Sequence, residues 1–212
     1  PQGAPSADPD EPLRLARRLH AQAEKLQWLM EALLKLSRLE TGVLAVRPAA
    51  GPVWPAVAKA LDGVRPAAAA KNLRLTAEPS PAQAVLDPKW TAEAVGNLLD
   101  NAVKYTPPGG TVSVRVTAYE LFCRIDVTDT GPGIPEEEQP RIFGRFYRAP
   151  NAREAEGVGI GLYLTRQIAA AQGGYLKLQS TPGAGSTFSL FLPRPQPNLT
   201  PAKDLPPKET GG

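Results

Sequence analysis

A leucine repeat near the N-terminus is the first regular pattern in the chain. Between Leu13 and Glu40, apolar positions recur at alternating spacings of three and four residues, with Gln22 in the one polar slot; they are Leu15, Leu19, Leu26, Leu29, Leu33 and Leu36. This spacing predicts a helix with a coiled-coil-type apolar stripe that packs against a partner. Gly42 stands where a helix stop is expected, and the following VLAVRP segment is predicted to be extended.

After residue 48, helical patterns alternate with short strand patterns. Helices are predicted at residues 53–70 and 87–105 and, after a loop-rich region at 130–157, up to residue 172; strands are predicted at 73–79, 83–88, 111–119, 121–129, 175–180 and 186–193. The strands TVSVRVTAY and LFCRIDVTD are predicted to form a hairpin. Together these elements predict an α+β fold: a two-layer α/β sandwich in which a mixed, mostly antiparallel sheet carries helices on one face, preceded by a long helix.

The two ends of the chain differ in composition from the middle. Residues 1–10 and 194–212 are proline-rich and polar, and are predicted to be disordered. The predicted organisation is therefore a helical segment at 11–42 and one globular domain at 43–193, between two disordered ends.

Composition excludes several classes of partner. Lysine plus arginine amounts to 24 residues against 21 acidic ones, and the basic residues are scattered, so neither nucleic acid nor a membrane surface is an expected partner. The longest apolar runs are too short to span a bilayer. The single cysteine, Cys123, lies in an apolar alternation and is predicted to be a buried thiol.

The predicted helix at 87–105 has an unusual polar stripe. Asn97 and Asn101 are one helical turn apart, and Lys104 follows on the same face. An amide oxygen is a suitable ligand for Mg²⁺, and an ammonium can neutralise phosphates. Taken alone, the stripe is equally compatible with a solvated helix face.

Two glycine-rich segments follow. DTGPGIP, Asp129 to Pro135, ends a predicted strand; its glycines permit close approach to a flat ligand, and Asp129 can accept a hydrogen bond from an exocyclic amine. GVGIGL, Gly157 to Leu162, leads into a helix whose free N–H groups can face phosphate oxygens. Taken alone, the first segment is better explained as a Pro/Gly turn capped by its aspartate, and the second matches neither a Walker A loop nor a dinucleotide fingerprint.

Aromatic and basic residues alternate in IFGRFYR, residues 142–148. Phe143 and Phe146 are predicted to anchor a loop. An arginine beside a nucleotide can stabilise charge on a γ-phosphate, and Arg148 is favoured over Arg145 for this role.

The order of these segments is more specific than any one of them. NLLDNAVKYT, DTGPGIP, IFGRFYR and GVGIGL resemble the N, G1, F and G2 boxes of sensor histidine kinases, in that order. The resemblance extends to PGAGSTFSLFLP, and EKLQWLMEALLKLSRLETG is similar to the second helix of the family's dimerisation and phosphotransfer hairpin. It covers nearly everything from Leu13 to Pro193.

The resemblance implies a GHKL-type ATP-binding fold that holds ATP and Mg²⁺. Asn101 would be the magnesium ligand, Tyr105 would lie against the adenine, Asp129 would bind the adenine amino group with help from Thr187 through water, and residues 149–156 would form a lid. The implied nucleotide-binding residues are Asn97, Asn101, Lys104, Tyr105, Asp129, Gly131, Gly133, Ile134, Arg148, Gly157, Gly159, Ile160, Gly161, Leu162 and Thr187, with Asn97, Lys104 and Arg148 acting in catalysis.

One feature departs from the family pattern. The phosphoacceptor motif of the family places an acidic residue after its histidine, whereas the only histidine here, His20, is followed by Ala21 and is predicted to be a plain surface residue. The chain is therefore expected to bind ATP without autophosphorylating by itself. It is expected to be a fragment of the cytoplasmic part of a membrane-anchored sensor, which dimerises through the complete hairpin and phosphorylates a response regulator.

Two other interpretations use the same motifs. ATPases of the same superfamily carry a glutamate one turn before the magnesium asparagine to activate water, and Asn97 occupies that position here. The chain could also be a non-catalytic nucleotide-binding or scaffold module that dimerises through residues 13–40. Such a module would not need to keep Asn101, Lys104 and Asp129 at the positions that the family motifs give them.

Overall fold

A five-stranded sheet organises the fold. The computed structural model describes residues 11–41, 46–148 and 159–196. The strand order is β2 (Arg74–Ala77), β4 (Thr111–Ala118), β5 (Phe122–Asp129), β7 (Gly185–Pro193) and β6 (Tyr175–Thr181). The β2–β4 pair is parallel and the other three pairs are antiparallel, which confirms the predicted mixed, mostly antiparallel sheet and the β4–β5 hairpin.

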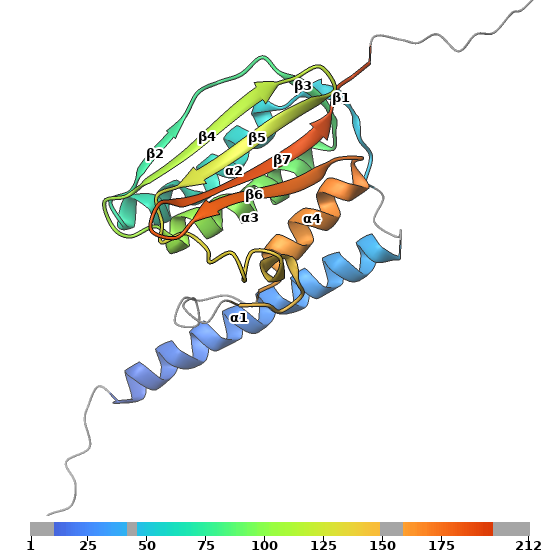
Figure 1. Cartoon of the computed structure of the whole chain (residues 1–212). Helices are drawn as coiled ribbons and strands as arrows, with labels where there is room; N and C mark the ends of the chain where they lie inside the picture. The colour runs from blue at the N-terminus through green and yellow to red at the C-terminus, as the bar shows by residue number, and fades with distance from the viewer. Residues whose placement is uncertain (1–10, 42–45, 149–158, 197–212) are drawn as a thin grey trace, which may run out of the picture.

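Three helices cover one face of this sheet. They are α2 (Trp54–Ala70), α3 (Pro88–Tyr105) and α4 (Gly161–Ala171), and the short 3₁₀ helix η1 (Arg141–Phe143) contacts α4. Figure 1 shows them behind and below the strands, as a second layer. The predicted two-layer α+β sandwich is confirmed.

Strand alternation explains why the helices cover only one face. Along β5, Cys123, Ile125 and Val127 are fully buried against the helices, whereas the alternate positions carry the polar residues Arg124, Asp126 and Thr128, of which Arg124 and Thr128 are only partly buried. Because successive side chains of a strand point to opposite faces, one face of β5 is apolar and the other polar. Cys123 is a buried free thiol, as predicted, and burial raises its pKa to about 11.

A second, two-stranded sheet was not predicted in its observed position. β1 (Ala49–Pro52) pairs antiparallel with β3 (Gln83–Leu86), so the strand begins after the predicted VLAVRP segment. Of that segment the structure describes Val46, Arg47 and Pro48, and the Arg47 N–H donates to Asp87 Oδ2 at 3.1 Å. The strand forms where β3 offers a partner, which the local pattern does not reveal.

The leucine helix lies beside the sandwich and contacts it through α4. It runs as α1 (Glu11–Glu40) below α4, which it contacts. Leu15, Leu19 and Leu26 on its apolar stripe are exposed, whereas Leu29 is partly buried against the core. His20 is exposed, as predicted. The stripe has more apolar surface than its contact with α4 covers.

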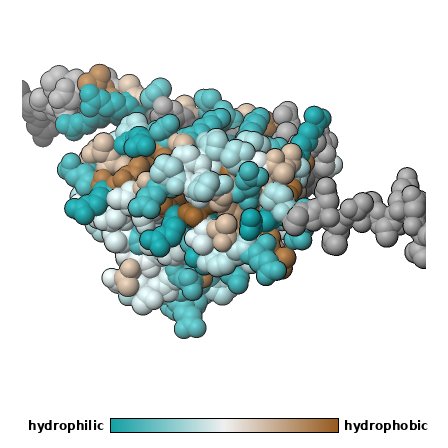
Figure 2. Space-filling view, turned by 90° about the horizontal axis from the view of Figure 1, so that it is seen from above, coloured by the Kyte–Doolittle hydropathy of each residue, from teal (hydrophilic) through white to brown (hydrophobic). Residues whose placement is uncertain are grey.

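Hydrophobic and hydrophilic residues are mixed on the face of the molecule seen from above. Viewed from above, hydrophobic side chains occupy small areas between hydrophilic ones (Figure 2). Within the described ranges, the helices are too short or too polar to cross a membrane.

A buried glutamine joins the two helices on either side of the predicted site. Gln172, which is 3% exposed, accepts hydrogen bonds through Oε1 from the Asp87 N–H at 2.6 Å and the Thr91 hydroxyl at 3.1 Å. Its Nε2 donates to the Ile168 carbonyl at 3.3 Å. The bonds connect the N-terminus of α3 to the C-terminus of α4, so the spacing of these helices depends on this side chain.

Replacing Gln172 with leucine is expected to lower the free energy of unfolding by about 2–3 kcal/mol, because it leaves the buried Thr91 hydroxyl and the partly buried Asp87 N–H without an acceptor. Urea unfolding monitored by circular dichroism measures the change. Gln179→Leu, at an exposed position of β6, serves as the control and should change stability by less than about 0.5 kcal/mol. Equal stability of Gln172→Leu and the wild type would show that these bonds do not hold the helices together.

Candidate nucleotide-binding site

The polar stripe of α3 faces the start of α4. Asp87 caps α3 by accepting from the N–H groups of Lys89 and Trp90, and the helix buries its apolar side against the core. On the polar side, Asn97 Nδ2 lies 3.5 Å from the Gly161 carbonyl oxygen, at the limit of a hydrogen bond. A Cβ at Gly161 would lie 3.8 Å from Asn97 Cγ. The structure thus brings the predicted N and G2 motifs into contact.

The other two residues of the stripe occupy the last turns of α3. Asn101 is partly buried, and its amide makes no hydrogen bond within the described part of the chain. Lys104 Nζ lies 5.0 Å from the centre of the Tyr105 ring. The amide of Asn101 and the ammonium of Lys104 are therefore placed where polar ligand groups could reach them.

Asp129 ends β5 in a buried position. It is 7% exposed, and its Oδ1 accepts a hydrogen bond from the Gly131 N–H at 2.8 Å. Burial raises the pKa of this carboxyl, and the backbone N–H groups of Gly131 and Ser186 oppose the rise. A buried carboxylate with an incomplete set of donors is a strong hydrogen-bond acceptor for a ligand.

The two glycines of the DTGPGIP segment are in close contact with the backbone. A Cβ at Gly131 would lie 3.2 Å from the Tyr105 carbonyl oxygen, so this loop packs on the C-terminus of α3. Gly133 has φ +70°, and a Cβ there would collide with the Thr181 carbonyl oxygen. Gly133 therefore requires glycine, both for this steric reason and because of its left-handed backbone conformation, whereas a side chain at Gly131 would crowd the Tyr105 carbonyl and Asp129 Oδ1.

Thr187 does not lie beside Asp129. Its hydroxyl is hydrogen-bonded to that of Thr128 at 2.9 Å, and both side chains lie on the sheet face opposite to Asp129. The prediction that Thr187 assists Asp129 is therefore corrected, because a shift of one residue along a strand reverses the face. Ser186, which is buried and pairs with Asp129 across β5 and β7, is the better candidate. Its position opposite Asp129 follows from the strand register, which sequence motifs alone did not supply.

The F segment lies between the other motifs. Gly159 has φ +78°, and a Cβ there would collide with the Tyr147 carbonyl oxygen, so the G2 segment approaches the F segment closely. The positive charge of Arg148 lowers the pKa of Tyr105 against the larger, raising effect of burial, which places Arg148 near the end of α3. Arg145 instead donates from Nη2 to the Tyr163 hydroxyl at 2.8 Å. Arg145 is thus bonded to α4, and the role of Arg148 stays a prediction.

The two predicted aromatic anchors of the F segment behave differently. Phe143 packs against the core as predicted, but Phe146 is 54% exposed, so its predicted anchoring role is wrong within the described chain. Phe146 has φ +60°, in a turn that Gly159 approaches, and the turn directs its side chain away from the core.

The remaining predicted positions are mostly apolar. Ile134 donates its N–H to Ser180 Oγ at 2.8 Å and packs on the core together with Leu162. Ile160 is 1% exposed, so it supports the site from within the core. Gly157 and the expected lid at 149–156 lie outside the described residues.

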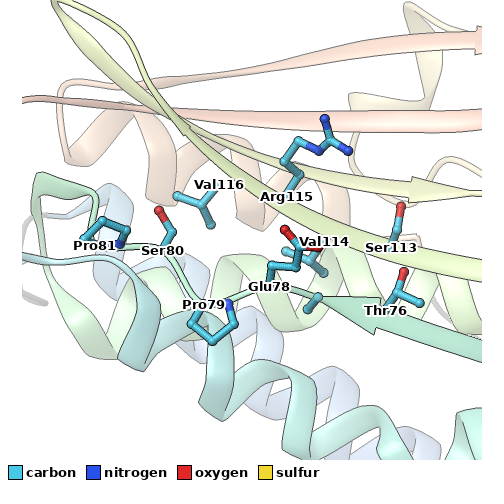
Figure 3. A pocket seen from close by; sticks show the side chains of 10 residues that line it. Thr76, Glu78, Pro79, Ser80, Pro81, Ser113, Val114, Arg115 and Val116 are labelled. Atoms are coloured by element: carbon cyan, nitrogen blue, oxygen red, sulfur yellow. The ribbon is translucent and has the colours of Figure 1, made fainter.

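A separate cavity lies at the other side of the sheet. It measures about 220 Å³ and is bordered by β2, the 78–81 segment and β4, as Figure 3 shows. Its polar side chains are those of Thr76, Glu78, Ser80, Ser113 and Arg115. None of the predicted motif residues lines it.

Comparison with known proteins agrees with this geometry. Residues 86–196 match the family model described as "Histidine kinase-, DNA gyrase B-, and HSP90-like ATPase". The chain is 34% identical over 206 residues to the signal transduction histidine-protein kinase/phosphatase MprB of Mycolicibacterium smegmatis, covering 93% of this chain and 41% of that protein. It is 34% identical over 193 residues to the sensor-like histidine kinase SenX3 of the same organism, covering 90% of this chain and 50% of that protein.

A solved structure agrees with the sequence matches. The chain resembles a mycobacterial sensor histidine kinase MprB structure with a TM-score of 0.60 and 30% sequence identity, covering 70% of this chain and 99% of that one. The chain thus spans half or less of the length of the two full relatives, whereas it covers nearly all of this solved domain.

Proposed function

Because this chain belongs to the family of histidine kinase-, DNA gyrase B- and HSP90-like ATPases, and carries the ATP-binding catalytic domain of a sensor histidine kinase, we propose a role in phosphoryl transfer for each residue of its site. One observation supports this division: the end of α3, the loop after Asp129 and the start of α4 meet. They do so through Tyr105 with Gly131 and Asn97 with Gly161.

The nucleoside binds at the inner end of this junction. Asp129 accepts a hydrogen bond from the exocyclic amine of adenine, and Ser186 stands beside it. Gly131 and Gly133 leave room for the flat base, and Tyr105 lies against it. The apolar residues Ile134, Ile160 and Leu162 support this pocket.

The phosphates bind along the polar stripe. Lys104 and Asn97 contact them from α3, and backbone N–H groups at Gly159 and Gly161 face them from the start of α4. Because helix N-termini favour anions, the α4 terminus and Lys104 neutralise the triphosphate from two sides.

The residues present also suit Mg²⁺. The described ranges contain no group of three or more His, Cys, Asp or Glu side chains that could hold a metal alone, so the protein contributes few ligands. Mg²⁺ takes such an arrangement readily, since it keeps several waters and shares phosphate oxygens. Asn101, whose amide has no protein partner within the described ranges, would hold the ion, which would neutralise charge on the phosphates.

The proposed reaction transfers the γ-phosphoryl group of ATP to an imidazole nitrogen, with ADP as the leaving group. Arg148 stabilises the charge on the transferred group. The acceptor histidine is supplied by another helix, and the phosphoryl group then passes to an aspartate of a response regulator.

The organisation of the longer protein is also proposed. Residues 11–42 form the second helix of the dimerisation and phosphotransfer hairpin, and residues 43–193 form the catalytic domain. The exposed leucines of α1 support a helix partner, hence a homodimer through the complete hairpin. The catalytic domain then lies on the cytoplasmic side of a membrane-anchored sensor.

ATP hydrolysis is the second candidate function. It requires a base for water, and the position one turn before Asn101 is Asn97, whose amide has no useful basicity and faces Gly161. Phosphoryl transfer to histidine is therefore favoured over hydrolysis.

A transfer assay tests the proposal. The chain is mixed with Mg²⁺ and γ-labelled ATP, with and without a separate fragment bearing a histidine helix of the family type, and acid-labile phosphate is recorded. Binding of ATP, with label appearing only on the added fragment, is the expected result. Labelling that disappears in His20→Ala would instead identify His20 as the acceptor, and rapid phosphate release without acceptor would identify an ATPase.

A further inference from the structure

Two carbonyl groups at the C-terminus of α3 receive no hydrogen bond from the backbone that follows the helix. The carbonyls of Val103 and Lys104 would normally accept from the N–H groups four residues later, but those residues are Pro107 and Pro108, which have none. The carbonyl of Ala102, one residue earlier, accepts from its local neighbours instead: the Thr106 N–H at 3.0 Å and the Thr106 hydroxyl at 2.6 Å.

Lys71 supplies the missing donors from another element. Its Nζ donates to the Val103 carbonyl at 2.7 Å and to the Lys104 carbonyl at 2.9 Å. The same ammonium also places a positive charge at the negative end of the α3 dipole. Within the described ranges, Lys71 forms no ion pair with a carboxylate, so these carbonyls are its contacts.

The backbone around Lys71 is fixed to the same loop. Lys71 ends α2, and its carbonyl accepts from the Gly109 N–H at 3.3 Å, while the Arg74 N–H donates to Gly110 at 2.9 Å. Asn72 turns the chain with φ +54°. The α2–β2 connection therefore holds both sides of the Pro107–Gly110 loop, and the Lys71 side chain is not simply a surface group.

The turn that Lys71 holds is the one that carries the proposed ligand contacts. Lys104 and Tyr105 lie in it, and the Tyr105 carbonyl packs against Gly131 of the adjacent loop. We propose that Lys71 is a positioning residue for nucleotide binding: it replaces the donors that the two prolines lack and so sets Lys104 and Tyr105 at the phosphates and the base. This inference rests on the proposed function.

Three variants test it. Lys71→Met keeps the apolar stem and removes the donors, Lys71→Arg keeps donors and charge, and Lys59→Met removes the same charge from an exposed position on the same helix. Each is examined for Mg-ATP affinity and for amide hydrogen exchange in the nucleotide-free protein, below its melting temperature.

Lys71→Met is expected to weaken Mg-ATP binding about tenfold, as the loss of two charge-assisted bonds implies, and to speed exchange at the Tyr105 and Thr106 amides. Lys71→Arg should restore most of both, and Lys59→Met should match the wild type. A purely structural role would lower the melting temperature without faster exchange confined to this turn.

The inference is overturned if Lys71→Met binds Mg-ATP as tightly as the wild type, or if Lys59→Met weakens binding equally. A wild-type chain that binds no nucleotide would refute the proposed function instead, and unchanged exchange at Tyr105 and Thr106 in Lys71→Met would then refute the positioning by Lys71 as well.

Discussion

Asp129→Asn is expected to weaken ATP binding by at least about a hundredfold, which corresponds to about 2.7 kcal/mol. The carboxylate is buried, so a mismatch with the adenine amine cannot be relieved by water. An asparagine side chain can still accept from the Gly131 N–H, but it then presents its NH₂ group, a donor, towards the base. Titration of a fluorescent ATP analogue measures the loss.

The fold should tolerate this change. Because the pKa of Asp129 is raised in the folded chain, its contribution to stability is fully present below the unfolded pKa and is lost as the pH rises through the folded pKa. At neutral pH the buried, ionised Asp129 side chain therefore lowers the free energy of unfolding, and the melting temperature of Asp129→Asn should equal or exceed that of the wild type.

The same shift predicts a pH dependence of binding. As the pH falls, Asp129 takes up its proton at a higher pH than an ordinary aspartate, so ATP affinity should begin to fall there, whereas Asp129→Asn should lack this dependence. Asp126→Asn is the matched control: Asp126 is also buried on β5, but it lies on the opposite face, where it accepts from the Ser189 hydroxyl and pairs with Arg124. Asp126→Asn should lose stability and keep ATP affinity. Unchanged affinity in Asp129→Asn would refute the assigned base pocket.

Asn101→Ala is expected to lower phosphoryl transfer to a supplied histidine helix by at least about a hundredfold, because a metal ligand contributes several kcal/mol of charge stabilisation. The substitution leaves α3 intact, since alanine is the strongest helix former and the Asn101 amide has no hydrogen bond to lose within the described chain.

The magnesium dependence of binding identifies the cause. Wild-type ATP affinity should fall when Mg²⁺ is removed with a chelator, whereas the affinity of Asn101→Ala should be low and nearly independent of Mg²⁺. Asp100→Ala, an exposed position beside it on α3, should behave like the wild type. Wild-type transfer by Asn101→Ala would exclude Asn101 as the metal ligand.

The local motifs were predictable because short-range rules determine them. The apolar alternation of β4 and β5 predicted the hairpin, and the predicted helix end at residue 105 is where α3 ends, just before Pro107 and Pro108. Gly131, Gly133 and Gly159 were predicted from the two glycine-rich segments, but the carbonyls that exclude a Cβ at Gly133 and Gly159 belong to Thr181 and Tyr147, which are distant along the chain. Periodicity and turn chemistry are thus local, whereas the contacts of these glycines are tertiary.

The less successful predictions involve packing between distant segments. Thr187 and Ser186 are adjacent, and only the pairing of β7 with β5 decides which of them faces Asp129. Phe143 and Phe146 have the same chemistry, yet Phe143 is partly buried against the core, whereas the turn at Phe146 leaves its side chain exposed. β1 formed where β3 was available rather than where its own sequence was most apolar.

By itself, the sequence determined the kind of most elements, the layer architecture and the order of the nucleotide motifs, because these depend on periodicity, turn chemistry and residues close along the chain. Only the tertiary structure decided which side chains meet. Lys71 lies more than thirty residues before the carbonyls it holds, and Gln172 more than eighty after Asp87. Such contacts arise from the packing of α2, α3 and α4 on one sheet, where burial makes an unpaired polar group too costly to leave unsatisfied.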